Sequence, residues 1–133
     1  MRFIIIVIII CISQVSCNYS ISGNERDVSS LYEKMRKGDL RSYGELKIAH
    51  LDYQPEMFIP IAKFAADTLR YIPANLDVFQ CYYDKYYFAY DSVAKVDLSK
   101  MSKKDREEAL YYLEKAIKYD DTLANHYKVL LKR

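Results

Sequence analysis

The stretch EALYYLEKAIKYDD occupies residues 108–121 and shows the clearest structural pattern in the chain. Its side chains Ala109, Leu113 and Ala116 are separated by four and then three residues, which is the spacing of one face of an α-helix. Ser102 precedes the stretch at a position typical of a helix N-cap, whose side chain accepts a backbone hydrogen bond. The sequence therefore predicts a helix that starts after Ser102 and ends at the two aspartates that close the stretch.

The rest of the chain shows the same helical spacing. The whole sequence has 3 Gly and 3 Pro, whereas hairpin-rich β folds need many more glycines at positive φ. The longest stripe of apolar and aromatic residues spans 76–94, with Asn75 as its expected N-cap. Four further helices are predicted. The first spans 30–37, with a capping box at Ser30 and a stop at Gly38, and the second spans 40–53, with Asp39 or Ser42 as its N-cap. The third has Pro60 in its first turn and ends before Pro73, and the last spans 123–131.

Residues 108–121 resemble the second helix of a tetratricopeptide repeat. In that family a small residue, a large residue and a second small residue pack the helical hairpin, and Ala109, Leu113 and Ala116 occupy these places. The resemblance places the packing aromatic of the next repeat at Tyr127. It implies an all-α fold of stacked antiparallel helical hairpins, with about three repeats and roughly six helices.

The packing aromatic recurs earlier in the chain. Tyr43 and Phe79 each begin a similar pattern, and the intervals from Tyr43 to Phe79 and from Phe79 to Tyr127 are 36 and 48 residues. The usual period of this repeat is about 34 residues. Residues 38–46 also resemble the opening of a Sel1-type repeat, and aspartate stands at 121 where proline is usual, so both families stay open. Without any resemblance, the pattern still predicts a small all-helical stack or bundle.

The resemblance also implies a set of binding residues. In these repeats the residues one, five and eight positions after the packing aromatic line a concave groove that holds a protein ligand. Counted from Phe79 and from Tyr127, the groove residues are Gln80, Asp84, Tyr87, Lys128 and Lys132. We therefore expect these five side chains to contact a protein partner.

Residues 1–16 have the layout of a secretory signal peptide, with a basic residue, an unbroken ten-residue apolar run and a short polar-to-small stretch. The apolar run is about half the length that a membrane-spanning helix needs. The residues before Cys17 resemble the end of a bacterial lipobox, although Gln14 stands where leucine is usual. The resemblance implies lipidation of Cys17 and a tether over 17–24, followed by a helical-repeat domain over 25–133.

The residue after this cysteine indicates a destination. Asn18 differs from the aspartate that resembles an inner-membrane retention signal, so we expect an outer-membrane lipoprotein that faces the periplasm. Cleavage near Cys17 by an ordinary secretory peptidase is the alternative, and it would leave a secreted protein.

Composition and spacing argue against several kinds of chemistry. The formal net charge is +2, from 20 Lys+Arg and 18 Asp+Glu, which lacks the basic excess of nucleic-acid-binding proteins. His50 and His126 lack a second His or Cys at helical ligand spacing, so we expect no metal. The sequence has no nucleophile motif and no glycine-rich phosphate loop, so we expect no cofactor and no enzymatic activity. Cys81 is expected to be a buried thiol, and the acidic pairs at 107–108 and 120–121 are expected on solvated helix ends.

The 14 tyrosines are the unusual feature of the composition. Their rings could lie in the core with hydroxyls at its edge, or they could form an exposed interface. Together, the signal, the repeat and the tyrosines favour an exported, non-enzymatic protein-binding module of the bacterial envelope. The alternatives are a periplasmic immunity protein that neutralises a delivered toxin and a glycan-binding lipoprotein, although the absence of Trp counts against the latter.

Overall fold

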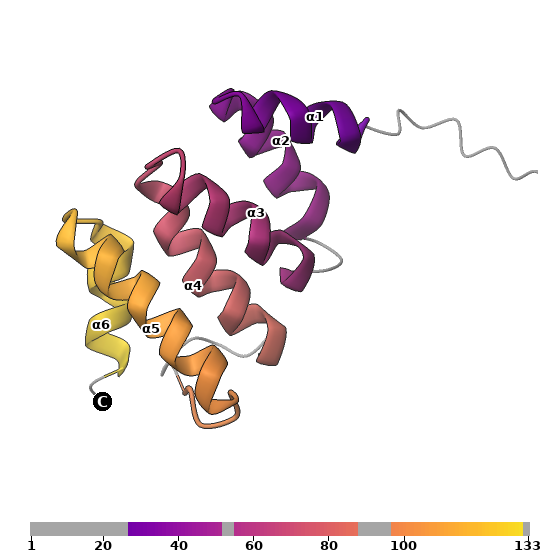
Figure 1. The fold of residues 1–133 in the computed structure, drawn as a ribbon. Helices are drawn as coiled ribbons and strands as arrows, with labels where there is room; N and C mark the ends of the chain where they lie inside the picture. The colour runs from indigo at the N-terminus through magenta and orange to yellow at the C-terminus, as the bar shows by residue number, and fades with distance from the viewer. Residues whose placement is uncertain (1–26, 52–54, 88–96, 132–133) are drawn as a thin grey trace, which may run out of the picture.

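The computed structural model describes residues 27–51, 55–87 and 97–131. Within these ranges the chain forms six α-helices and no strand, which confirms the all-α prediction. The helices are α1 (Val28–Arg36), α2 (Leu40–Leu51), α3 (Pro55–Asp67), α4 (Pro73–Tyr86), α5 (Lys103–Lys118) and α6 (Thr122–Leu131) (Figure 1).

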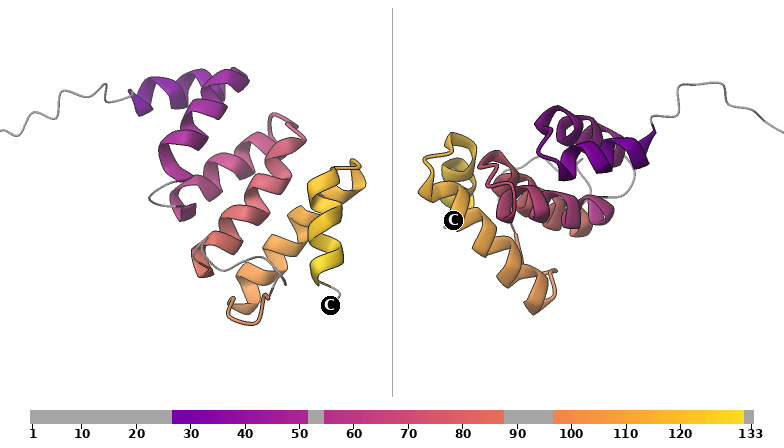
Figure 2. Two further views of the ribbon diagram at one scale, coloured as in Figure 1. Left: turned by 180° about the vertical axis from the view of Figure 1, so that it is seen from behind. Right: turned by 45° about the horizontal axis from the view of Figure 1, so that its top comes forward.

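The helices follow one another in a row of hairpins. Each helix packs against the next one along the chain, and Figures 1 and 2 show α3 and α4 lying between the α1–α2 and α5–α6 pairs. Side chains also join alternate helices, because Tyr43 of α2 bonds to Asp77 of α4 and Phe79 of α4 packs on Tyr127 of α6. This arrangement lets each hairpin cover the apolar face of its neighbour, as in helical-repeat proteins.

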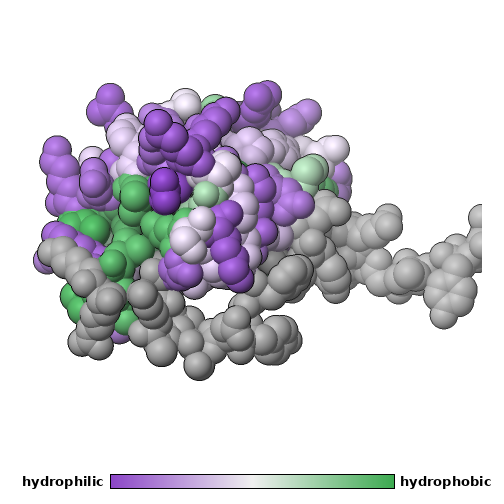
Figure 3. Space-filling model, turned by 90° about the horizontal axis from the view of Figure 1, so that it is seen from below, coloured by the Kyte–Doolittle hydropathy of each residue, from purple (hydrophilic) through white to green (hydrophobic). Residues whose placement is uncertain are grey.

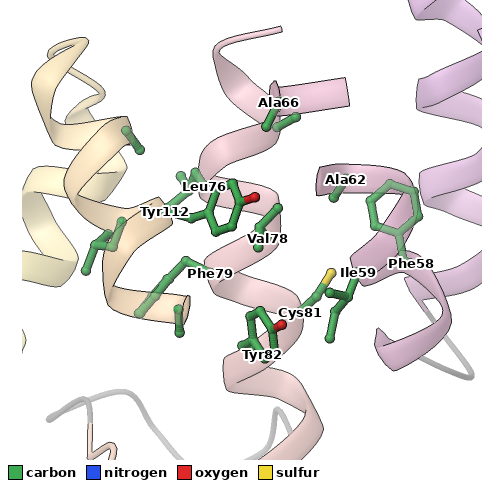
Figure 4. Close-up of a cluster of buried hydrophobic side chains, with 14 of the residues drawn as sticks. Phe58, Ile59, Ala62, Ala66, Leu76, Val78, Phe79, Cys81, Tyr82 and Tyr112 are labelled. Atoms are coloured by element: carbon green, nitrogen blue, oxygen red, sulfur yellow. The ribbon is translucent and has the colours of Figure 1, made fainter. Parts of the chain in front are cut away.

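The core lies mainly along the contacts that α4 makes with α3 and α5. In Figure 4, Ile59 of α3 lies beside Cys81 of α4, while Leu76 of α4 lies beside Tyr112 of α5. The short side chain of Ala62, which is fully buried, lets α3 approach α4 closely. Each large apolar side chain buried here stabilises the fold by about 1.5–3 kcal/mol.

The helix predicted from residues 108–121 is confirmed as α5. The Ser102 hydroxyl accepts a 3.1 Å hydrogen bond from the backbone N–H of Asp105, so Ser102 is the N-cap. Ala109, Leu113 and Ala116 are all at least 98% buried. The small–large–small face therefore does pack the hairpin, as its spacing predicted.

Two predicted N-caps are wrong. Asp27, not Ser30, caps α1, because its carboxylate accepts a 3.1 Å hydrogen bond from the Ser30 N–H. The second wrong N-cap is Asn75, because α4 begins at Pro73, whose fixed φ suits the first helical position. Asn75 therefore lies inside α4, where its amide donates to the Ile72 carbonyl oxygen at 2.8 Å.

The helix ends also differ in part from the prediction. Gly38 stops α1 with a φ of 95°, as expected, and the Asp39 carboxylate accepts the Arg41 N–H and caps α2. Pro60 lies inside α3 and not in its first turn, because α3 already begins at Pro55. The predicted helix over 76–94 ends early, since Tyr87 has an extended backbone with φ −130°. The remainder of that prediction, 88–94, and the predicted end of the second helix at 52–53 lie outside the described residues.

Candidate functional site

Three of the predicted binding residues lie on one strip of α4. Gln80, Asp84 and Tyr87 follow one another at intervals of four and three residues, so they share a side of the helix. At about 100° per residue, this side lies between Asp77, which contacts α2, and Phe79, which contacts α6. We call Gln80, Asp84 and Tyr87 the α4 strip.

A stack of aromatic rings borders the α4 strip. The Tyr87 ring stacks on the Tyr83 ring, with 4.6 Å between centroids, and Tyr83 stacks in turn on Phe79. The Lys100 ammonium lies 5.4 Å from the centroid of the Tyr87 ring, and the Lys100 backbone N–H donates to the Tyr87 hydroxyl at 3.2 Å. The aromatic part of the strip is therefore held in place by both α4 and the 97–102 loop.

The polar part of the strip is less constrained. The Gln80 amide nitrogen lies 3.5 Å from the Tyr127 hydroxyl, which is a long hydrogen bond. Asp84 is half-buried, and burial raises the pKa of its carboxyl group. Within the described part of the chain, the Asp84 carboxylate makes no hydrogen bond and no ion pair.

Of the two predicted lysines, Lys128 of α6 does not join the α4 strip. Lys128 is exposed and lines a hollow of about 460 Å³ between α5 and α6, whose other lining residues are Leu110, Leu113, Glu114, Ile117 and Leu131. Figure 3 shows a hydrophobic area on the side of the molecule where α5 and α6 lie. Lys132 lies outside the described residues. The structure thus brings together three of the five predicted residues.

Within the described residues, four clusters that the sequence did not predict connect the helices. In each cluster, one carboxylate accepts hydrogen bonds from both a tyrosine hydroxyl and a lysine ammonium group. The clusters are Asp77 with Tyr43 and Lys47, Glu108 with Tyr82 and Lys63, Asp105 with Tyr86 and Lys85, and Asp67 with Tyr112 and Lys115.

These clusters correct two expectations about polar residues. Glu108 does not simply face solvent, because its carboxylate is 2.5 Å from the Tyr82 hydroxyl and 2.6 Å from the Lys63 ammonium. The hydroxyls of the four clustered tyrosines bond to carboxylates instead of simply reaching water at the edge of the core. The sequence contains only part of this pattern. Tyr43 and Lys47 share a helix face, but Asp77, whose carboxylate accepts hydrogen bonds from both, lies 30 or more residues further along the chain.

Cys81 and the two histidines are the residues considered for chemistry. Cys81 is buried, and burial raises the pKa of its thiol to about 12, so it is no thiolate nucleophile near neutral pH. The His50 ring lies 6.4 Å from the Phe58 ring, while His126 is exposed on α6. Among the described residues, no group of three His, Cys, Asp or Glu side chains is arranged to hold a metal ion.

No family model, curated protein or solved structure matches this chain. The tetratricopeptide and Sel1 resemblances therefore stay predictions that rest on the residues of 38–46 and 108–121. None of the helices in the three described ranges has the length and apolarity needed to cross a membrane.

The Asp105 and Glu108 clusters predict that the folded domain becomes less stable at acidic pH. The hydrogen bond from Lys85 lowers the pKa of Asp105, and the hydrogen bond from Lys63 lowers the pKa of Glu108, each with help from a tyrosine. A carboxyl group with a lowered folded-state pKa stabilises the fold above its unfolded-state value, here 3.8 or 4.5. This contribution is lost as the pH falls through the folded-state pKa.

We therefore expect the free energy of unfolding in urea to decrease as the pH falls below about 4.5. The D105N/E108Q variant should be less stable than the wild type at pH 7 by about 1 kcal/mol per site, with a smaller difference at pH 3. Equal differences at pH 7 and pH 3 would contradict the proposed role of the two charges.

Proposed function

We propose that this chain is an exported, lipid-anchored helical-repeat protein that acts as a non-enzymatic protein-binding module of the bacterial envelope. The observation that carries the binding role is the α4 strip, where polar and aromatic side chains share one side of a helix held on its flanks by α2 and α6. Tyrosine is enriched where proteins bind each other, because its rigid ring combines apolar area with a polar tip. The inert surroundings of Cys81 are consistent with a role in binding.

The proposed anchor rests on the sequence, since residues 1–26 lie outside the described residues. The apolar run and the residues before Cys17 support export and lipidation. Two or more acyl chains would hold the protein stably at a membrane, where one chain is marginal. We place the protein at the outer membrane, on its periplasmic side, with secretion as the alternative.

The anchor is tested by intact mass spectrometry of the protein expressed in a bacterial host. We expect the wild-type mass to show removal of residues 1–16 and acylation of the new N-terminal Cys17. The C17A variant should show no acyl mass and retain its N-terminal segment. The C11A variant is the matched control, because Cys11 lies in the removed segment and the mature mass should not change. An unmodified mature chain would rule out the anchor.

The binding role is tested by site-specific photo-crosslinking in cells. A crosslinker at Tyr87 should form a discrete adduct with one protein, whereas a crosslinker at Tyr111, an exposed tyrosine on α5, should not. The identity of the adduct separates an envelope partner from a toxin, which would support the immunity alternative. The absence of any protein adduct at Tyr87 would contradict the proposed protein-binding role and favour the glycan-binding alternative.

A further inference from the structure

Asp84 differs from the four clustered carboxylates of the helical stack. Each of those carboxylates accepts a lysine ammonium and a tyrosine hydroxyl. The Asp84 carboxylate has neither kind of partner in the described part of the chain, although it is half-buried. Removing a charge from water without a counter-ion is unfavourable, and burial accordingly raises the pKa of this group.

Among the described residues, no lysine or arginine forms an ion pair with Asp84. Lys85 follows Asp84 directly, but it points elsewhere on the helix and bonds to Asp105 at 2.7 Å. Lys47 of α2 bonds to Asp77 at 2.5 Å. Both lysines are engaged with other carboxylates, so neither is available to pair with Asp84.

The neighbours of Asp84 suit a planar cation. Gln80 precedes Asp84 by four residues and Tyr87 follows it by three, so both side chains flank it on the helix surface. The Gln80 side-chain oxygen can accept a hydrogen bond, so Gln80 and Asp84 together offer acceptors for a cation that carries several N–H groups. The Tyr87 ring stacks on Tyr83 and carries the Lys100 ammonium at 5.4 Å, so a cation from a partner would pair with Asp84 and Gln80 beside this ring and not on its face.

We propose that the α4 strip recognises a basic side chain of the bound protein, arginine foremost, with Asp84 as its counter-ion. Arginine fits best because its planar guanidinium group carries five N–H donors, which can bond to the Asp84 carboxylate and to the Gln80 side-chain oxygen at the same time. This inference rests on the proposed protein-binding function and adds the chemistry of the partner. The partner segment would carry an exposed arginine or lysine at the centre of its contact with α4.

The first test is the thermal stability of the unbound protein. D84N keeps the shape of the side chain and removes its charge, so we expect the Tm to rise by about 2–5 °C at pH 7. D105N is the matched control and should lower the Tm, because Asp105 has partners in the folded chain. A lower Tm for D84N would show that its carboxylate is already satisfied, and would overturn the inference.

The second test is selection of random 12-residue peptides on the full mature protein. We expect the selected peptides to share one arginine or lysine position, and to bind D84N at least about tenfold more weakly. E114Q removes a comparable charge from α5, away from the strip, and should not change the affinity. Peptides without a basic position, whose binding is nevertheless lost in Y87A, would overturn the inference and keep the proposed function. Failure to select any peptide, together with no crosslink at Tyr87, would overturn both.

Discussion

Replacement of Phe79 by alanine is expected to destabilise the domain by about 3–5 kcal/mol. Phe79 is fully buried on α4, and its ring lies 5.0 Å from the Tyr127 ring of α6 and 6.3 Å from the Tyr83 ring. The substitution removes the apolar contact between α4 and α6 and leaves a cavity between helices that are far apart in sequence. Since small domains are stable by only about 5–15 kcal/mol, the loss is a large fraction of the total.

Urea unfolding followed by circular dichroism at 222 nm measures this loss, with V129A as the matched control. Val129 is 51% exposed on α6, so its truncation should change the free energy of unfolding by less than about 0.5 kcal/mol. A loss below about 1 kcal/mol for F79A would mean that α6 does not depend on this contact. In that case the packing of α6 would contribute little to the stability of the other helices.

The parts of the fold that were predicted correctly depend on local signals. Ser102 and the face of Ala109, Leu113 and Ala116 lie within one helix and its cap, so their spacing alone places α5. Gly38 ends α1 for a similar reason, because its positive φ favours a residue without a side chain. In both cases the deciding contacts join residues a few positions apart.

The wrong predictions arise where two local signals compete. Asp27 and Ser30 are both good N-caps three residues apart, and the sequence does not show which of them has the non-helical backbone. At the start of α4, Asn75 has the typical identity of a cap, but Pro73 starts the helix two residues earlier. Packing in the folded chain decides between such neighbours.

The clusters of tyrosine, carboxylate and lysine could not be predicted, because their members come together only when the helices pack. The hydrogen bonds that form them join residues 19 to 48 positions apart. The candidate site could be predicted from the sequence only in part. Helical spacing predicts that Gln80, Asp84 and Tyr87 share a side of α4, while only the packed structure shows that the Asp84 carboxylate lacks the partners that the clustered carboxylates have.

Replacement of Asp77 by alanine is the second substitution expected to have a large effect on the free energy of unfolding. Asp77 is 93% buried, and its carboxylate is 2.6 Å from the Tyr43 hydroxyl and 2.5 Å from the Lys47 ammonium. D77A leaves the buried Tyr43 hydroxyl without its acceptor, whereas the Lys47 side chain is 35% exposed and can be hydrated. Burial also raises the pKa of Tyr43, so its hydroxyl stays a proton donor that needs a partner. We expect D77A to destabilise the domain by about 2–4 kcal/mol.

A double-mutant cycle separates this cost from the loss of packing. The Y43F/D77L variant removes the donor and the acceptor together and fills the space with apolar atoms, which is often nearly neutral for buried polar pairs. We therefore expect the double variant to be more stable than the sum of Y43F and D77L predicts, by at least about 1 kcal/mol in urea unfolding. Additive effects would mean that Tyr43 and Asp77 stabilise the contact between α2 and α4 through shape alone.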